Sequence, residues 1–263
     1  MNIAVCVKQT VDSEAAVVVG ADGRVDTEGQ AHVIDPYSEF AVERAVQLVE
    51  AQGGSVAVVC IGGNEAIPAV RHALSMGADE GYLVDDEALA ETDATGRACV
   101  LAAALVRLAP DLVLGGCKSA DTSSSQTMPR VAELMSLPCV QVVTTLEVDA
   151  SAGKARAVRE IDDGSAVIEV AMPAVITAQQ GLAEPRYPNV RSIMQSKKKP
   201  VTVWTLNDLG VDAAVVSPER ARTKVVCYRS KPARQGGFIV KGDTVADVVS
   251  TTVGLLSTEA KVI

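Results

Sequence analysis

The segment 115–126 carries the side chains of this sequence that are best suited to holding a phosphate group. It reads Gly-Gly-Cys-Lys-Ser-Ala-Asp-Thr-Ser-Ser-Ser-Gln and follows an apolar run that ends at Leu114. The paired glycines, the hydroxyl side chains and the start of a helix near Gln126 would supply backbone N–H groups, hydroxyl donors and the positive end of a helix dipole. A solvated, serine-rich turn that caps a helix explains the same residues equally well, so both interpretations stay open.

A second segment, 181–200, has two interpretations, a surface that binds another protein and an ordinary surface loop. Its middle carries the apolar side chains of Val190, Ile193 and Met194, and charged residues precede and follow them. Apolar anchors flanked by charges suit docking, because the charges steer encounter and the anchors supply affinity. An ordinary loop followed by a solvated run of lysines is the alternative interpretation.

Conventional catalytic chemistry has few candidate residues in this sequence. The GxGxxG, GxxxxGK[ST], GxSxG and HExxH motifs are missing, which argues against the Rossmann dinucleotide, Walker and common hydrolase mechanisms. The six cysteines are widely spaced without a CxxC pair, and the two histidines, His32 and His72, fall in no Cys/His or Ser/His arrangement. We therefore expect reduced thiols, no metal site and no enzyme-type active site.

The elements that would position these segments alternate along the first 140 residues or so. Apolar runs at 3–7, 55–61, 81–84 and 112–114 predict strands. Helical patterns are predicted from Asp35-Pro36 to Gly53-Gly54 and at 65–76, 93–108 and 126–135, with a small excursion over 12–33 before the first. This alternation indicates a parallel sheet with helices on its faces. Ligands bind beyond the carboxyl ends of such strands, so the segments after Val7, Ile61 and Leu114 should converge on one crevice.

The pattern changes from helical to strand-like at Cys139. Residues 140–148, 155–160 and 166–170 predict antiparallel hairpins, and 174–177 a further strand. After residue 200 the apolar runs are short, with a last amphipathic stretch at 243–256. We therefore expect an α/β fold over 1–200, with a doubly wound, mostly parallel, Rossmann-like sheet and appended hairpins. Residues 201–263 should form an extended C-terminal arm.

Composition limits the classes of partner. The chain has 263 residues, of which 48% are hydrophobic, 22% charged and 3% aromatic, as in a globular protein. Its net charge of −9 disfavours nucleic acid and anionic membranes as main partners. No apolar run approaches the ~20 residues of a bilayer span, and Met1 leads directly into a strand rather than a signal peptide. We expect a soluble, cytoplasmic protein that binds no nucleic acid and inserts into no membrane.

A series of short matches in order along residues 1–212 resembles the beta subunits of electron transfer flavoproteins, the family that includes the FixA proteins. The matched strings include Val7-Lys8, Asp35-Pro36, Met76-Gly77-Ala78-Asp79, Gln126-Thr127, Arg159-Glu160, Glu184-Pro185-Arg186-Tyr187 and Asp208-Leu209-Gly210-Val211-Asp212. The resemblance implies a heterodimer whose alpha subunit holds the redox-active FAD, and an arm that packs on that subunit. The beta chain would carry AMP or, in electron-bifurcating members, a second FAD. It would be an electron carrier rather than an enzyme, linking a flavin dehydrogenase, such as an acyl-CoA dehydrogenase, to a quinone-linked or other acceptor.

The resemblance also assigns individual residues. The nucleotide contacts it implies are Cys6, Asp35, Pro36, Tyr37, Ser38, Ile61, Ser119, Ala120, Asp121, Thr122, Ser123, Ser124, Ser125, Gln126, Thr127, Met128, Pro129 and Arg130. The docking loop it implies covers 184–196, with contacts from Arg186, Tyr187, Val190, Ile193 and Met194. Val190 takes the position of the family's docking leucine.

Some positions depart from the family's pattern. Asp35 stands where asparagine is common. The stretch 121–129 shares Gln126-Thr127 with AMP-binding members and Pro129 with bifurcating members, so AMP and a second FAD both stay open. An ATP-using enzyme on the same scaffold is a weaker alternative, because its Ser-Gly-Gly-x-Asp-Ser loop is replaced here by Lys8-Gln9-Thr10-Val11-Asp12. An assembly subunit without any ligand is the third alternative.

Overall fold

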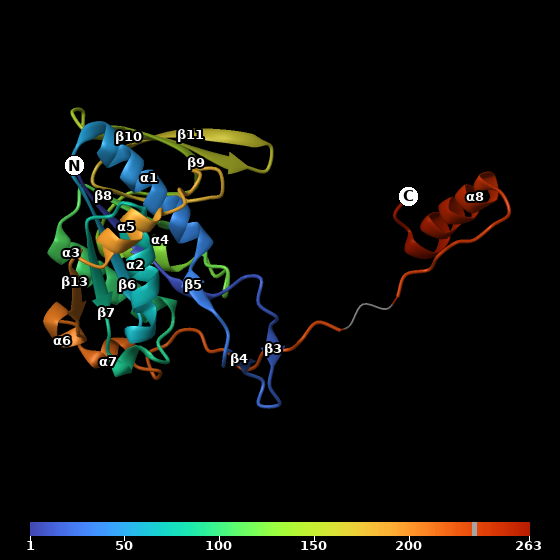
Figure 1. Ribbon diagram of the computed structural model, residues 1–263, viewed down its shortest axis with the longest axis horizontal. Helices are drawn as coiled ribbons and strands as arrows, with labels where there is room; N and C mark the ends of the chain where they lie inside the picture. The colour runs from blue at the N-terminus through green and yellow to red at the C-terminus, as the bar shows by residue number, and fades with distance from the viewer. Residues whose placement is uncertain (233–235) are drawn as a thin grey trace. The chain divides into compact units, whose positions relative to one another are not determined.

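A computed structural model describes residues 1–232 and 236–263 of the chain (Figure 1). Contacts between residues divide the chain into two compact units, Met1–Cys227 and Tyr228–Ile263. The helices are α1 (Pro36–Gln52), α2 (Ile67–Met76), α3 (Ala94–Leu108), α4 (Thr127–Leu134), α5 (Val190–Ser196), α6 (Leu206–Leu209), α7 (Ala213–Val216) and α8 (Val245–Leu255), with short helical turns η1 (Asn64–Ala66), η2 (Glu87–Leu89) and η3 (Leu256–Ala260).

Within the described residues, the first unit is built on a nine-stranded sheet of order β11-β10-β9-β12-β8-β1-β6-β7-β13. Its parallel part consists of β13 (Val201–Trp204), β7 (Glu80–Val84), β6 (Ser55–Ile61), β1 (Asn2–Val7), β8 (Leu112–Gly116), β12 (Ala174–Ala178) and β9 (Cys139–Asp149). The antiparallel strands β10 (Lys154–Ile161) and β11 (Gly164–Ala171) continue it, as the hairpin pattern predicted.

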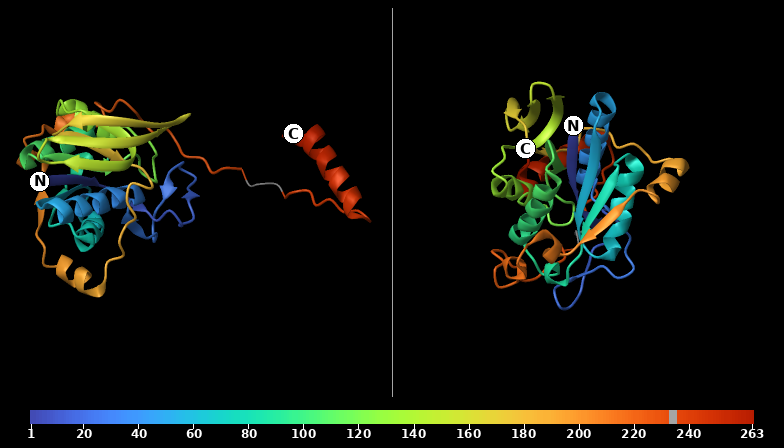
Figure 2. Two further views of the ribbon diagram at one scale, coloured as in Figure 1. Left: turned by 90° about the horizontal axis from the view of Figure 1, so that it is seen from above. Right: turned by 90° about the vertical axis from the view of Figure 1, so that its left-hand side faces the viewer.

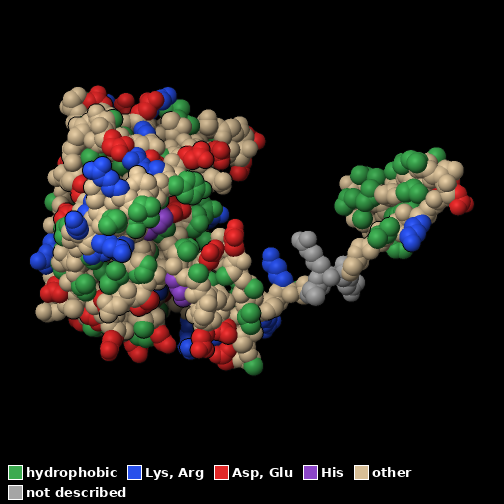
Figure 3. All heavy atoms as spheres, viewed as in Figure 1, with side chains coloured by type: hydrophobic (Ala, Val, Ile, Leu, Met, Phe, Trp, Pro, Cys, Tyr) green, Lys and Arg blue, Asp and Glu red, His purple; other side chains and the backbone are tan. Residues whose placement is uncertain are grey.

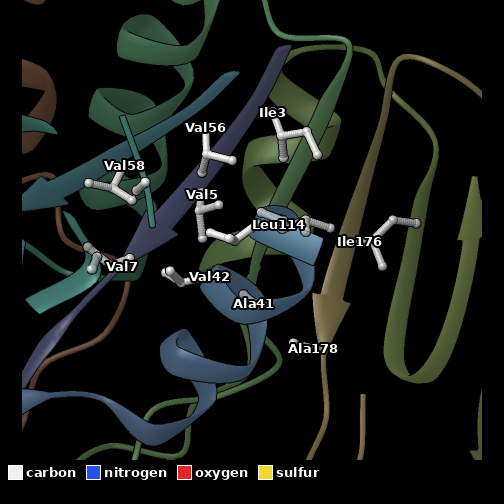
Figure 4. Close-up of a cluster of buried hydrophobic side chains, with 14 of the residues drawn as sticks. Ile3, Val5, Val7, Ala41, Val42, Val56, Val58, Leu114, Ile176 and Ala178 are labelled. Atoms are coloured by element: carbon white, nitrogen blue, oxygen red, sulfur yellow. The ribbon is translucent and has the colours of Figure 1, made fainter. Parts of the chain in front are cut away.

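Alternating side chains along β1 separate two apolar clusters, one on each face of the sheet. Ile3, Val5 and Val7 lie beside Ala41 and Val42 of α1 (Figure 4), in a cluster that also includes residues of α2. Ala4 and Cys6 pack with α3 and α4 on the opposite face. Alternation in a strand sends successive side chains to opposite faces, so both faces of this buried strand must be apolar. Helices on both faces make the sheet doubly wound, which confirms the predicted fold class.

The start of α1 follows from its capping residues. The Asp35 side chain accepts from the backbone N–H groups of Tyr37 and Ser38, and Pro36 occupies the first turn, where its missing N–H costs nothing. The helix ends at Gly53, whose φ of 78° is available to glycine without strain. Both ends agree with the prediction from the sequence.

The excursion predicted between the first strand and the first helix consists of two small ribbons. β2 (Gln9–Val11) pairs with β5 (His32–Ile34), and β3 (Val18–Val19) pairs with β4 (Val25–Asp26). Because β5 ends next to Asp35, this ribbon leads the chain directly into α1 at the carboxyl end of β1.

The first unit extends beyond residue 200, where we expected the arm to begin. β13 pairs with β7, and Trp204 stacks on Tyr82 with ring centroids 4.4 Å apart. Farther along, the Asp93 carboxylate at the start of α3 accepts from the backbone N–H of Arg222 at 2.8 Å. Burial of Trp204, Leu206 and Val216 explains why this stretch packs with the sheet rather than leaving it.

The second unit begins at Tyr228, and its amphipathic stretch at 243–256 forms the helix α8 (Val245–Leu255). The side chain of Thr244 caps this helix through the backbone N–H of Asp247. None of the helix's residues is buried. Over residues 1–232 and 236–263, no helix combines the length and the apolar character that crossing a bilayer requires.

Candidate functional site

Three strand ends meet at one edge of the sheet. β8, β1 and β6 are parallel neighbours, with Cys6 opposite Gly115 on one side and Val7 opposite Cys60 on the other. After β1 the chain adds β6 and β7 on one side and only then returns to place β8 on the other side. This reversal next to β1 is the position where open α/β sheets bind ligands. The segments after Val7, Ile61 and Leu114 therefore lie at a common edge, as the sequence predicted.

Asp35 ties the loop after β8 to the start of α1. Its side chain is buried and accepts from Tyr37 N at 3.1 Å and from Ser38 N at 3.3 Å. Its other oxygen accepts from Ala120 N at 2.7 Å, across 85 residues of sequence. Burial raises the pKa of Asp35 above its ordinary value, although these three backbone hydrogen bonds oppose the shift. Both oxygens thus have protein donors, and the residue positions the loop.

Lys8 places a positive charge beside this loop. Its Nζ lies 2.7 and 2.5 Å from the two Asp121 oxygens and 3.3 Å from Ser119 Oγ. Burial alone would raise the pKa of Asp121, but the hydrogen bonds from Lys8, Ser119 and the Thr122 backbone, together with the Lys8 charge, outweigh burial and lower that pKa. The sequence reasoning did not assign Lys8 to the site. Its position directly after the first strand was the signal, because that is where the adjacent strand ends meet.

The loop itself is pressed against α1 at its base and exposed at its tip. A Cβ at Gly116 would stand 2.7 Å from Tyr37 Cβ and 2.9 Å from Lys118 O, so only glycine fits without displacement. At the tip, the side chains of residues 121–126 are exposed, and Ser123 and Ser125 have φ angles of 48° and 52°. Hydroxyl groups that face solvent are therefore available to a ligand.

The helix that follows the loop has a free N-terminus for an anion. Among the described residues, no side chain caps the start of α4, which begins at Thr127. Its first N–H groups therefore lack a side-chain acceptor and carry the positive end of the helix dipole. Together with Lys8 and the exposed hydroxyls, this donor set fits a phosphate group. The arrangement favours the phosphate interpretation of the loop over a turn that is already capped.

The remaining residues of the implied nucleotide set lie under or beside the loop. Cys6 and Met128 are buried, and Met128 fills the space in front of Gly115. Burial raises the pKa of the Cys6 thiol to about 12, so this residue offers apolar contact rather than a reactive thiolate. Arg130 donates to Gln126 Oε1 at 2.9 Å, which leaves its guanidinium at the loop. Pro36, Tyr37, Ile61 and Pro129 are half-buried along the same edge.

The docking residues lie on a different element, and part of the expected loop is helical. α5 begins after Asn189, whose side chain accepts from Ser192 N at 2.9 Å. The side chains of Tyr187, Val190 and Met194 are 99%, 75% and 63% exposed, and that of Ile193 is also exposed. Arg186 instead turns inward to carboxylates of α1. The asparagine cap was the sequence signal for this helix, which is too short to show a periodic pattern.

Comparison with known proteins agrees with this architecture. The model of the electron transfer flavoprotein domain matches residues 22–209. The chain is 37% identical to the electron transfer flavoprotein subunit beta of Bacillus subtilis (strain 168), with both chains covered in full. It is 39% identical to the subunit of the same name from Syntrophomonas wolfei, over 92% of this chain and 91% of that one. The chain belongs to the electron transfer flavoprotein beta-subunit family.

Within this family the chain also resembles a protein of a larger assembly. It is 31% identical to subunit CarD of the caffeyl-CoA reductase-Etf complex of Acetobacterium woodii, over 97% of this chain and 98% of that one. Electron transfer flavoprotein beta subunits serve electron transfer rather than catalysis. The positions matched by the domain model include α1, the loop after β8 and α5, so the family assignment covers both candidate surfaces.

Proposed function

We propose that this chain is the beta subunit of a heterodimeric electron transfer flavoprotein and binds an adenine nucleotide beyond the carboxyl ends of β8, β1 and β6. The observation that carries the proposal is the donor set at this edge, formed by Lys8, the exposed hydroxyls of the loop and the uncapped start of α4. The names of the relatives, which are beta subunits of electron transfer flavoproteins, support a partner subunit and a flavin in the complex. In this proposal the alpha partner holds the redox-active FAD.

The residues present fit the phosphate of AMP or the diphosphate of a second FAD. Backbone N–H groups of the loop and of α4 would bind phosphate oxygens, and Lys8 would turn from Asp121 toward them. A bound FAD in the heterodimer would supply the acceptance and donation of electrons. This chain's own contribution is to hold the nucleotide and to cover the flavin environment, for which no side chain needs to act as an acid or a base.

The nucleotide can be identified by release from the intact heterodimer. The protein is purified together with its alpha partner, denatured, and the supernatant is separated by chromatography. About one flavin and one AMP per heterodimer would support the AMP-binding carrier, whereas about two flavins and no AMP would support a second FAD in this chain and a bifurcating type. A heterodimer that releases neither flavin nor adenylate would overturn the proposal.

The exposed segment around α5 is proposed to dock a flavin dehydrogenase, such as an acyl-CoA dehydrogenase, with a quinone-linked or other acceptor receiving the electrons. Val190 and Met194 supply exposed apolar surface, and Arg191, Lys197 and Lys198 are exposed beside them. Lys and Arg side chains gather over α5 in Figure 3. An apolar centre with charges around it suits transient recognition. A cytoplasmic location stays a prediction from the sequence.

A further inference from the structure

The docking segment has little apolar support of its own. Figure 2 shows α5 standing away from the sheet between two connections, a longer one from residues 182–189 and a short turn at residues 197–200. Ser196 is the only buried residue of this helix. A pocket of about 230 Å³ lies between part of the segment and the end of α2, with Met76, Gly77, Pro188 and Lys199 among its lining residues. Apolar packing therefore contributes little to fixing the position of this segment.

The first connection is fixed by a guanidinium that two carboxylates share. Arg186 Nε and Nη2 donate to the Glu43 oxygens at 2.8 and 3.0 Å, and its Nη1 and Nη2 donate to the Glu50 oxygens at 2.7 and 2.9 Å. The backbone N–H of Arg186 also donates to Glu43 at 3.2 Å. Glu43 is buried, and Gln47 donates to it at 2.9 Å. Bidentate contacts of this kind fix orientation as well as distance.

The second connection is fixed by two cations, Arg71 on α2 and Lys199 in the turn after α5, and each binds carbonyl oxygens of the other segment. Arg71 on α2 donates to the carbonyl oxygens of Ser196 at 2.6 Å and Lys199 at 2.7 Å, just after α5. In return, Lys199 Nζ donates to the carbonyl oxygens of Leu74 at 3.0 Å and Ala78 at 2.5 Å, at the end of α2. Cations at helix C-termini satisfy carbonyls that have no partner within the helix.

These contacts divide the charged residues of the segment into two groups. Arg186 is bound by carboxylates of α1 and Lys199 by carbonyl oxygens at the end of α2, whereas Arg191, Lys197 and Lys198 are exposed and have no such contacts among the described residues. Binding a partner with a loose segment costs the conformational entropy of ordering it, and a segment that is already ordered avoids this cost. We propose that Arg186 at one end, and Arg71 with Lys199 at the other, are positioning residues that fix segment 187–198 in its docking conformation before a partner dehydrogenase binds.

This inference rests on the docking role proposed above and is tested in the heterodimer with its alpha partner. The probe is an acyl-CoA dehydrogenase reduced by its acyl-CoA. In Arg186→Gln, amide hydrogen exchange over 187–195 without dehydrogenase should rise about tenfold. The dehydrogenase concentration at half-maximal transfer should rise about tenfold, while the limiting rate and the flavin content stay unchanged. Arg186→Lys keeps the charge but not the fork, so its effects should be intermediate.

Two further variants separate the loss of the positioning contact from general destabilisation of the fold. Arg186→Gln leaves the buried Glu43 unpaired, so the double variant Arg186→Gln with Glu43→Gln removes that charge and should show the same faster exchange. Arg71→Gln frees the other end without touching Glu43, and faster exchange at 193–198 is expected there. Arg191→Gln is the matched control, because its side chain is exposed. It should leave hydrogen exchange unchanged.

The outcomes separate this inference from the docking function. Unchanged exchange over 187–195 in folded Arg186→Gln would overturn the inference. The inference would also be overturned if Arg186→Gln left the dehydrogenase concentration at half-maximal transfer unchanged while Val190→Asp strongly impaired transfer. In that case the docking function would stand, and the positioning role of Arg186 would fail. If Val190→Asp itself leaves transfer unchanged, the docking function fails and the inference fails with it. In the Val190→Asp background, Arg186→Gln should raise half-saturation no further, because there is no anchor left to present.

Discussion

Asp35 and Asp121 lie at the same edge of the sheet, but their surroundings shift their pKa values in opposite directions. Burial dominates at Asp35 and raises its pKa, so the folded state favours its protonated form. At Asp121 the contact with Lys8, together with hydrogen bonds from Ser119 and Thr122, outweighs burial and lowers the pKa. Asp35 thus costs stability at neutral pH, and that cost is relieved as pH falls through its raised pKa, whereas Asp121 contributes stability that is lost as pH falls.

Lys8→Met tests the pH dependence of this pair. Both side chains are about one-third exposed, 32% for Lys8 and 37% for Asp121. We expect a loss of up to about 1 kcal/mol of unfolding free energy at pH 7. The lowered pKa of Asp121 means that its ion pair with Lys8 stabilises the fold above the pKa that Asp121 has in the unfolded chain. This stabilisation is lost as pH falls through the pKa of the folded state, so wild type and Lys8→Met should become more alike in stability below about pH 4. Urea denaturation of wild type and Lys8→Met at several pH values from about 3 to about 7 measures this difference in unfolding free energy.

A control variant separates the pair from either charge alone. Asp121→Asn should lose a similar amount, and the double variant with Lys8→Met should lose little more, because the two residues share one interaction. Denaturation curves of wild type and Lys8→Met that stay equally far apart at every pH would contradict the assignment. Weaker retention of adenylate in Lys8→Met is expected in the same preparations.

Val190 gives the second prediction at the residue scale. Its side chain is 75% exposed, so substitution should leave the fold and the bound flavin intact. Val190→Asp places a charge in the docking contact and should slow transfer from reduced dehydrogenase about tenfold or more. Val190→Leu adds one methylene, worth about 0.8 kcal/mol when buried, and should tighten docking about fourfold. Stopped-flow transfer rates at several dehydrogenase concentrations measure both effects.

The matched control for this pair is Val106→Asp on α3. Val106 is 65% exposed. Its helix lies on one face of the sheet, whereas α2 and the neighbouring α5 lie on the other face. Transfer rates should therefore stay at the wild-type value. A decrease in Val106→Asp as large as that in Val190→Asp would show that added negative charge, rather than loss of the anchor, causes the effect.

At the scale of elements, the loop after β8 depends on how closely it approaches α1. Gly116→Ala puts a methyl group against Tyr37 Cβ and the Lys118 carbonyl, neither of which is the end of a flexible side chain. Overpacking of this kind costs about 1–3 kcal/mol and displaces the backbone. We expect lower stability by denaturation and a reduced amount of adenylate per heterodimer.

Gly115→Ala is the control within the same loop. Its added methyl group would meet only the sulfur and neighbouring carbons of Met128, which has flexible torsions and can move aside. Its effects on stability and adenylate content should be clearly smaller than those of Gly116→Ala. Equal effects of the two substitutions would mean that the contact with Tyr37 does not fix the loop.

At the scale of the whole molecule, the two units differ in what they bury. The first unit contains both apolar clusters of the sheet, whereas α8 of the second unit has no buried residue. Val245, Val249 and Val253 are all exposed. Exposed apolar residues repeated along one helix indicate a surface that another chain covers. This supports the prediction that the arm packs on the alpha subunit.

Truncation after Cys227 tests that prediction. Removing residues 228–263 should change the unfolding free energy of the isolated beta chain by less than about 0.5 kcal/mol, because α8 contributes no buried residue. The midpoint of thermal unfolding should then move by about 1–2 °C. Recovery of the alpha partner in co-purification should fall sharply. Full recovery with the truncated chain would show that the arm does not hold the heterodimer together.

Local patterns in the sequence were enough for the main strands and helices of the first 178 residues, but not for α5 or β13. The start of α1 at Asp35-Pro36 and its end at Gly53 depend on capping groups within a few residues of each other, so both could be predicted. The convergence of strand ends followed from the alternation of strands and helices, since parallel strands connected in this way end at one edge. Ordered short matches along the chain also identified the family.

Only the tertiary structure decided which distant side chains meet. Lys8 and Asp121 are 113 residues apart, and Arg186 and Glu43 are 143 residues apart. Local sequence patterns therefore cannot predict that either pair is in contact. The same holds for β13, which joins the sheet beside β7 instead of beginning an arm. Periodicity reports which face of an element is buried, whereas the choice of partner depends on how the packed elements cross in space.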